Sequence, residues 1–164
     1  MNFTHSTLAA AVAVLLSCLP AAGQIDTSTD EGQIGQALRD VRIALASGDI
    51  DGAMKHYWND PRLTVIDPDE GLRLNGWTYY KTWLQDRTPL QKNLVWRAHE
   101  RKVHVRGDNA FVTFLVTRQV QMGSTIRQKN ERGTYVLKKM DGKWLIVAQH
   151  ISAFPPMLDF QQTK

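Results

Sequence analysis

Two strand-like segments joined by an Asp-Gly dipeptide at 141–142 fill the last third of the chain and constrain the fold most. Asp-Gly suits a two-residue hairpin turn, and both flanks are rich in β-branched and aromatic residues. Period-two alternation along residues 143–153 predicts that Trp144, Ile146 and His150 share one face of a strand. Both faces of this segment are largely apolar, so we expect an interior strand that is covered on both sides.

The rest of the chain predicts helices first and strands afterwards. Amphipathic spacing and capping residues predict helices at residues 30–48 and 49–58, a short strand at 63–66, and a third helix that begins at residue 75 or 76. Strand-like patterns separated by turns predict long strands at residues 93–105, 110–122, 125–140 and 143–153. We therefore expect an α+β domain whose curved, mostly antiparallel sheet buries one face on three N-terminal helices.

The N-terminus has the features of a secretory signal. Residues 1–23 contain no Lys, Arg, Asp or Glu, and their apolar run at 8–19 is too short to span a bilayer comfortably. Small residues at 21–23 predict cleavage before Gln24, which makes residues 24–164 a single exported domain, periplasmic or secreted, with no transmembrane segment. The alternative is a lipoprotein anchored through Cys18, the only cysteine. Cleavage before Gln24 leaves neither disulfides nor thiol chemistry.

The charge is distributed unevenly along the chain, which carries a net charge of +4. Residues 91–164 hold five acidic and thirteen basic residues, but the basic residues are spread through the predicted strands and do not form an arm. A solvated sheet face, or a pocket for an anionic ligand, fits this distribution better than a nucleic-acid site. We therefore expect no nucleic-acid partner.

Three passages carry a resemblance to a known family. They are Gly-Asp-Ile at 48–50 with Tyr57 and Val-Ile-Asp-Pro at 65–68; Gly76 before an aromatic helix; and Arg132-x-Thr134 with Asp-Gly-Lys-Trp at 141–144 and His150-x-Ser152. In this order they resemble the SnoaL-like and ketosteroid-isomerase-like branch of the nuclear-transport-factor-2-like superfamily. The resemblance implies a cone-shaped α+β barrel. It does not select a function, because the superfamily includes isomerases, dehydratases, cyclases, hydrolases and proteins without catalysis.

The resemblance gives one residue a catalytic role. Asp67 directly precedes Pro68 and looks like the general base of steroid isomerases, which needs a partly desolvated carboxylate at the mouth of an apolar cavity. The two oxyanion donors of those enzymes are missing, since Val41 and Thr134 or their neighbours stand where the donors would be. An enolate without them would lose several kcal/mol of stabilisation. Steroid isomerase activity is therefore not expected.

His150, Arg132 and Asp67 form the predicted catalytic site. Hairpin pairing brings the strand of Arg132 beside that of His150, where a guanidinium and an imidazole could bind a carboxylate or enolate. Two structural readings remain open. His150 and Arg132 could form a buried polar network that ties the sheet to a helix. Asp67 could have no role beyond forming the turn that follows the short strand.

These patterns predict a ligand-binding cone. The predicted lining residues are Tyr57, Trp58, Trp83, Trp96, Phe114, Thr134, Trp144 and Ile146. We expect the cone to bind a small, largely apolar molecule, with an anionic group as one option. Cofactor-free acid/base chemistry of the isomerase, dehydratase or hydrolase type could follow, and whether the protein is an enzyme stays open.

Neither a cofactor nor a metal is implied by the sequence. It has no phosphate-binding loop, no dinucleotide glycine pattern and no zinc-type histidine spacing. The alternative function is a non-catalytic dimeric module for ligand sensing or assembly. A homodimer is expected in either case, through an outer sheet face carrying Val112, Val116 and Val120 or their alternates.

Overall fold

The structure is a computed structural model that describes residues 25–68, 73–90 and 92–153. The predicted signal peptide at 1–23 lies outside these residues. The described elements are α1 (Asp30–Ser47), α2 (Ile50–Met54), β1 (Thr64–Ile66), β2 (Arg73–Asn75), α3 (Trp77–Arg87), the 3-10 helix η1 (Thr88–Leu90), β3 (Lys92–Arg106), β4 (Asn109–Met122), β5 (Thr125–Met140) and β6 (Lys143–Ala153). None of the helices in this described part is long and apolar enough to cross a membrane.

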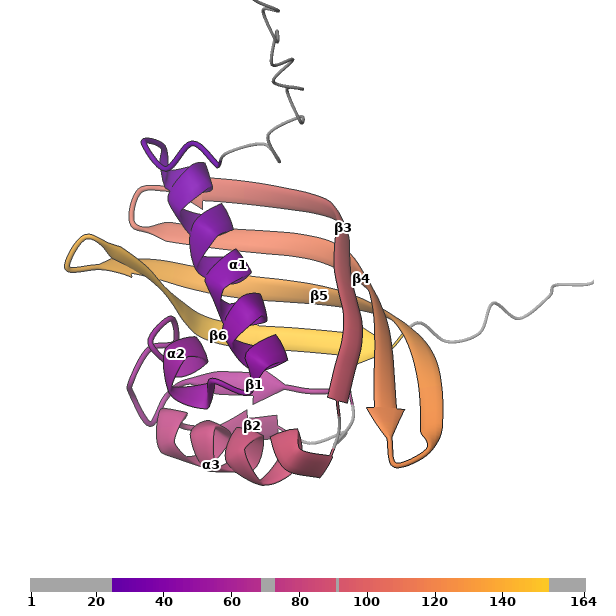
Figure 1. Cartoon of the computed structure of the whole chain (residues 1–164). Helices are drawn as coiled ribbons and strands as arrows, with labels where there is room; N and C mark the ends of the chain where they lie inside the picture. The colour runs from indigo at the N-terminus through magenta and orange to yellow at the C-terminus, as the bar shows by residue number, and fades with distance from the viewer. Residues whose placement is uncertain (1–24, 69–72, 91, 154–164) are drawn as a thin grey trace, which may run out of the picture.

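The strands form one six-stranded sheet in the order β2-β1-β6-β5-β4-β3. All neighbouring strands are antiparallel except β1 and β6, which run parallel. The sheet curls strongly, and α1 lies across its concave face while α2 and α3 close one end (Figure 1). The predicted α+β class and the curved sheet on N-terminal helices are therefore confirmed.

The inner face of the sheet is the apolar face and packs on the helices. Along β4 the even-numbered residues point inward, so Val112, Val116 and Val120 are buried. The sequence left open whether these valines or their alternates face outward, and the structure places the alternates on the outer face. Phe111 is the largest of these alternates and remains exposed.

The second helix is shorter than predicted because the backbone after Met54 forms hydrogen bonds with β6. Asp49 caps α2 by accepting a hydrogen bond from the Gly52 amide at 2.8 Å, but α2 ends at Met54, not near Trp58. The chain then runs beside β6, where the Trp58 amide donates to the Ile146 carbonyl and the Ile146 amide donates to the His56 carbonyl. Strand β2 was not predicted, because its sequence Arg-Leu-Asn contains no β-branched or aromatic residue, unlike the equally short β1.

A β-bulge interrupts β6 and reverses its alternation. Leu137 pairs with Ile146, whereas the preceding Val136 pairs with Ala148, so Val147 is an extra residue in β6. Ile146 points inward before the bulge, and Gln149 points inward after it. Even-numbered residues of β6 therefore point inward before the bulge, and odd-numbered residues point inward after it.

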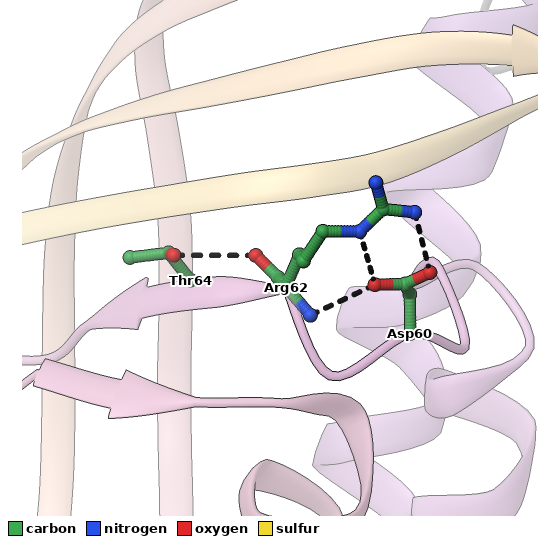
Figure 2. A network of polar contacts seen from close by, with 3 residues as sticks. All are labelled: Asp60, Arg62 and Thr64. Carbon is green, nitrogen blue, oxygen red and sulfur yellow. Dashed lines mark hydrogen bonds and ion pairs between the residues drawn. The ribbon is translucent and has the colours of Figure 1, made fainter.

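A polar turn anchors the chain where it enters β1. Asp60 accepts hydrogen bonds from the backbone and side chain of Arg62 at 2.8 Å, and the Thr64 hydroxyl donates to the Arg62 carbonyl (Figure 2). The bond to Arg62 lowers the pKa of Asp60 to about 2. The Arg62 guanidinium also lies 4.5 Å from the centre of the Trp58 ring. This turn joins the segment after α2 to the start of β1.

Candidate functional site

A cavity of about 650 Å³ lies between the helices and the inner face of the curved sheet. Its described lining residues are Leu38, Val41, Arg42, Leu45, Ala46, Ser47, Gly48, Tyr57, Asp67, Tyr80, Trp83, Leu84, Arg87, Thr88, Pro89, Trp96, Arg118, Gln121, Gly123, Tyr135, Gln149 and Ile151. A volume of this size accommodates a small organic molecule. Apolar side chains from α1, α3 and β3 supply much of the wall, and polar groups gather in two places.

The first polar group joins Tyr57, Tyr80 and Gln149. The Tyr57 hydroxyl donates a hydrogen bond of 2.6 Å to Gln149 Oε1, and the Tyr80 hydroxyl hydrogen-bonds with both of these residues. The two tyrosine rings meet edge to face with centres 5.3 Å apart. The three residues come from the segment after α2, from α3 and from β6, so the cluster ties the helices to the sheet.

Asp67 lies beside this cluster and borders the cavity. It directly follows β1 and its residue is 9 % exposed. Burial raises the pKa values of Tyr80 and Tyr135, and the nearby Asp67 carboxylate raises them further. Burial also raises the pKa of Tyr57 well above its usual value. All three hydroxyls therefore stay protonated at neutral pH. Tyr57 already donates its proton to Gln149, so Tyr80 and Tyr135 are the hydroxyls that can donate to a ligand.

The second polar group contains arginines. Arg118 on β4 forms a buried ion pair of 2.8 Å with Glu131 on β5, and Arg42 and Arg87 reach the cavity from α1 and α3. The Arg87 guanidinium lies 5.1 Å from the centre of the Trp83 ring, another cavity residue. This side of the cavity therefore combines positive charge with aromatic rings.

The structure brings four of the predicted site residues to the cavity: Asp67, Tyr57, Trp83 and Trp96. Phe114, Trp144 and Ile146 are buried in the core and do not line it. The Phe114 ring stacks on Tyr135 with centres 5.0 Å apart. The Trp144 indole donates to Asp30 at the start of α1. Trp58 is half-buried beside Arg62 and likewise lies outside the cavity lining.

His150, Arg132 and Thr134 lie on the outer face of the sheet. Pairing brings them together as predicted, since Thr134 is opposite His150 and the Arg132 Nε donates to the Ser152 hydroxyl at 3.3 Å. However, His150 and Arg132 are exposed and line a separate groove of about 330 Å³. The prediction that His150 shares the face of Ile146 is wrong, because the bulge at Val147 reverses the alternation between them.

Sequence reasoning missed most of the cavity wall, including the polar residues Tyr80, Gln149 and Arg118. Tyr80 belonged to a stripe of aromatic residues that is typical of core packing. Regular alternation places Gln149 on the face opposite to Ile146. No turn residue in the sequence marks the bulge that reverses this alternation. Arg118 could have been noticed in the sequence, because it is a charged residue on the same strand face as the apolar residues Val116 and Val120.

Residues 34–157 match the family model of the SnoaL-like domain. Among solved structures, a nuclear-transport-factor-2-like superfamily protein from Salmonella enterica is similar, with a TM-score of 0.72 at 17 % identity over 82 % of this chain and 98 % of that one. A candidate dehydratase of the nuclear-transport-factor-2-like family from Streptomyces avermitilis has a TM-score of 0.67 at 18 % identity, over 79 % of this chain and 99 % of that one. A nuclear-transport-factor-2-like protein of unknown function from Pseudomonas putida has a TM-score of 0.66 at 22 % identity, over 77 % of this chain and 88 % of that one. These likenesses establish the fold.

Proposed function

The chain belongs to the SnoaL-like domain family, and we propose that its cavity binds a small, largely apolar molecule on which Asp67 carries out proton transfer without a cofactor. The observation that carries this proposal is the position of Asp67, a carboxylate in the cavity wall next to protonated tyrosines. The candidate dehydratase from Streptomyces avermitilis supports proton-transfer chemistry on this fold. The reaction class is that of an isomerase, dehydratase or hydrolase.

The chemistry needs a base and a donor on the same polar group of the ligand. The Asp67 carboxylate can accept a proton from a carbon or hydroxyl of the ligand, while Tyr80 and Tyr135 donate hydrogen bonds to a neighbouring oxygen as it gains negative charge. The two tyrosines come from α3 and from β5. The cavity thus has donors that do not depend on the positions of Val41 and Thr134.

Binding can be tested with phenylnaphthylamine, a neutral apolar dye whose fluorescence rises in apolar surroundings. We expect the wild-type protein to bind it, and the variant Leu45→Trp, which narrows the cavity, to bind it several-fold more weakly. The matched control His150→Gln changes the outer groove only and should bind the dye as the wild type does. Equal binding by the wild type and Leu45→Trp would contradict a cavity site.

Catalysis can be tested by hydrogen exchange on tetralone, a small apolar ketone. In deuterated buffer, wild-type protein should accelerate exchange of the hydrogens next to the carbonyl, and Asp67→Asn should lose most of that acceleration, of the order of a hundredfold for a positioned base. Asp51→Asn is the matched control, because Asp51 is a carboxylate on α2 outside the cavity lining. If the wild type binds tetralone without accelerating exchange, the cavity is a binding site and not a proton-transfer site.

A non-catalytic dimeric module for sensing or assembly is the second candidate. The observation in its favour is the pair Phe111 and Val136, which are cross-strand neighbours on the outer face and are 47 % and 40 % exposed. A second copy of the chain would cover them. The open cavity supports the first candidate, because a purely assembling module has no need for an unfilled interior.

We further propose that the protein is exported and cleaved before Gln24, on the composition of residues 1–23. The intact mass of the exported form distinguishes the two processing routes. A mass that begins at Gln24 supports a periplasmic or secreted protein. A diacylated species that begins at Cys18 would instead place the protein on a membrane.

A further inference from the structure

The ion pair of Arg118 and Glu131 is buried on the inner sheet face, where Lys129 is the cross-strand neighbour of Arg118 on β5. The Arg118 Nη2 lies 2.8 Å from Glu131 Oε1, and the side chain of Glu131 is 2 % exposed. The inward neighbours of Arg118 along β4, Val116 and Val120, are both buried. Arg118 itself lines the cavity, whereas Glu131 is absent from the described lining. The member of the pair that borders the cavity is therefore Arg118.

Stability does not account for such a pair. Removing two charges from water is costly, and replacing a buried ion pair by apolar residues of similar volume is often neutral or stabilising. Aliphatic residues already occupy the adjacent inward positions of β4, so the fold would accept them here as well. A role in the cavity accounts for the pair better, because a guanidinium can hold a carboxylate on one edge and present another edge to a second anion.

The surroundings of Arg118 favour a ligand with negative charge. Among the described residues of the cavity lining, three are arginines, namely Arg42, Arg87 and Arg118, and one is a carboxylate, Asp67. Trp96 is the cross-strand partner of Arg118 and lines the same cavity, so an apolar ring against Trp96 would lie beside the guanidinium. This combination suits an apolar molecule that ends in an anionic group.

We propose that Arg118, oriented by Glu131, binds the anionic group of the cavity ligand, which makes the ligand an apolar carboxylate. The proposal rests on the proposed function, since it requires that the cavity binds a small molecule. The anionic group lies at Arg118, and the reacting part of the ligand lies at Asp67 and Tyr80. Arg118 is in this sense a specificity-determining residue, and Glu131 is a positioning residue.

Two dyes with the same ring system separate this proposal from simple apolar binding. Anilinonaphthalene sulfonate carries a sulfonate that stands in for the carboxylate, and phenylnaphthylamine lacks it. The double variant Arg118→Met, Glu131→Met removes both charges together, so that neither member of the pair is left without the other. We expect the double variant to bind the sulfonate dye about 10- to 100-fold more weakly than the wild type, which is the affinity that a hydrogen bond to a charged group contributes. It should bind the neutral dye with the wild-type affinity.

The surface ion pair of Asp60 and Arg62 provides the matched control (Figure 2). Its distance is also 2.8 Å, and Asp60→Asn, Arg62→Met likewise removes one positive and one negative charge, away from the cavity lining. This control should keep the wild-type affinities for both dyes. Circular dichroism and thermal unfolding verify that each variant is folded.

Arg118→Lys tests the same idea if the double variant fails to fold. Lysine keeps the positive charge opposite Glu131 but lacks the planar guanidinium with its several N–H donors. Binding of the sulfonate dye should therefore weaken, and binding of the neutral dye should not change. An unchanged ratio of the two affinities in a folded variant would overturn the role of Arg118. If neither dye binds the wild-type cavity, the proposed function itself fails, and this outcome differs from loss of the sulfonate dye alone.

Discussion

The hydroxyl of Tyr57 donates a hydrogen bond of 2.6 Å to Oε1 of Gln149, although 92 residues separate the two in the sequence. Both residues are buried, and Tyr80 joins them. The bulge at Val147 turns Gln149 inward, while backbone pairing with Ile146 holds Tyr57 in place. The polar wall of the cavity therefore depends on the irregular part of β6.

Replacement of Tyr57 by Phe should destabilise the protein by about 1–3 kcal/mol, because it leaves a buried amide without its donor. The free energy of unfolding in urea measures this effect. Tyr79→Phe is the matched control, since Tyr79 lies on α3 and is 59 % exposed. Equal stability of the two variants would show that the hydrogen bond contributes nothing.

Asp30 should make the stability of the protein depend on acidic pH. Hydrogen bonds from Lys139 and then from Trp144 lower the pKa of Asp30 from 3.8. Since the folded pKa is lower than the unfolded one, this stabilisation is fully present above about pH 4 and is lost as pH falls through the lowered value. Asp30→Asn should therefore have a lower Tm than the wild type at neutral pH, and the difference should shrink in acid.

Thermal unfolding at several pH values measures this difference. Asp86→Asn is the control, because Asp86 is an exposed carboxylate on α3. Its Tm should follow that of the wild type at every pH. A constant gap between Asp30→Asn and the wild type down to about pH 2 would contradict the assignment of the pH dependence to Asp30.

Gly133 makes room for the ring of Phe114. A Cβ at Gly133 would lie 2.3 Å from Phe114 Cζ, and that ring stacks on Tyr135. Gly133→Ala should therefore cost about 1–3 kcal/mol of unfolding free energy, as overpacking does. If the clash is the cause, the double variant with Phe114→Leu should lose less stability than the sum of the two single changes.

The succession of elements was predictable from the sequence because its signals are local. Asp49 and the Asp-Gly turn at 141–142 mark element ends through their own backbone preferences, and long alternating runs such as β4 are recognisable as strands. The end of α2 was not predictable, since its last turn yields to pairing with β6, which lies about 90 residues further on.

The site was less predictable than the fold for a related reason. Alternation assigns a residue to a face only while a strand is regular, and the extra residue Val147 moves His150 outside and Gln149 inside. No local residue pattern marks this bulge, which lies where the neighbour of β6 changes from Tyr57 to β1. Asp67, next to a short and regular strand, was placed correctly at the cavity.

The last prediction concerns a homodimer formed through the outer sheet face. Phe111 and Val136 are neighbours there and remain exposed, so a second copy would remove apolar surface from water. Val136→Lys should break such a dimer, because a two-fold interface places the new charge on both sides. Ile43→Lys on α1 is the control, since Ile43 is an exposed aliphatic residue on a helix.

Sedimentation equilibrium at micromolar concentration measures this assembly. The wild type and Ile43→Lys should sediment with the mass of two chains, and Val136→Lys with the mass of one. A monomeric wild type would contradict the dimer. If Val136→Lys stays dimeric, the two copies associate through another surface, because a charge at the centre of an apolar interface weakens it.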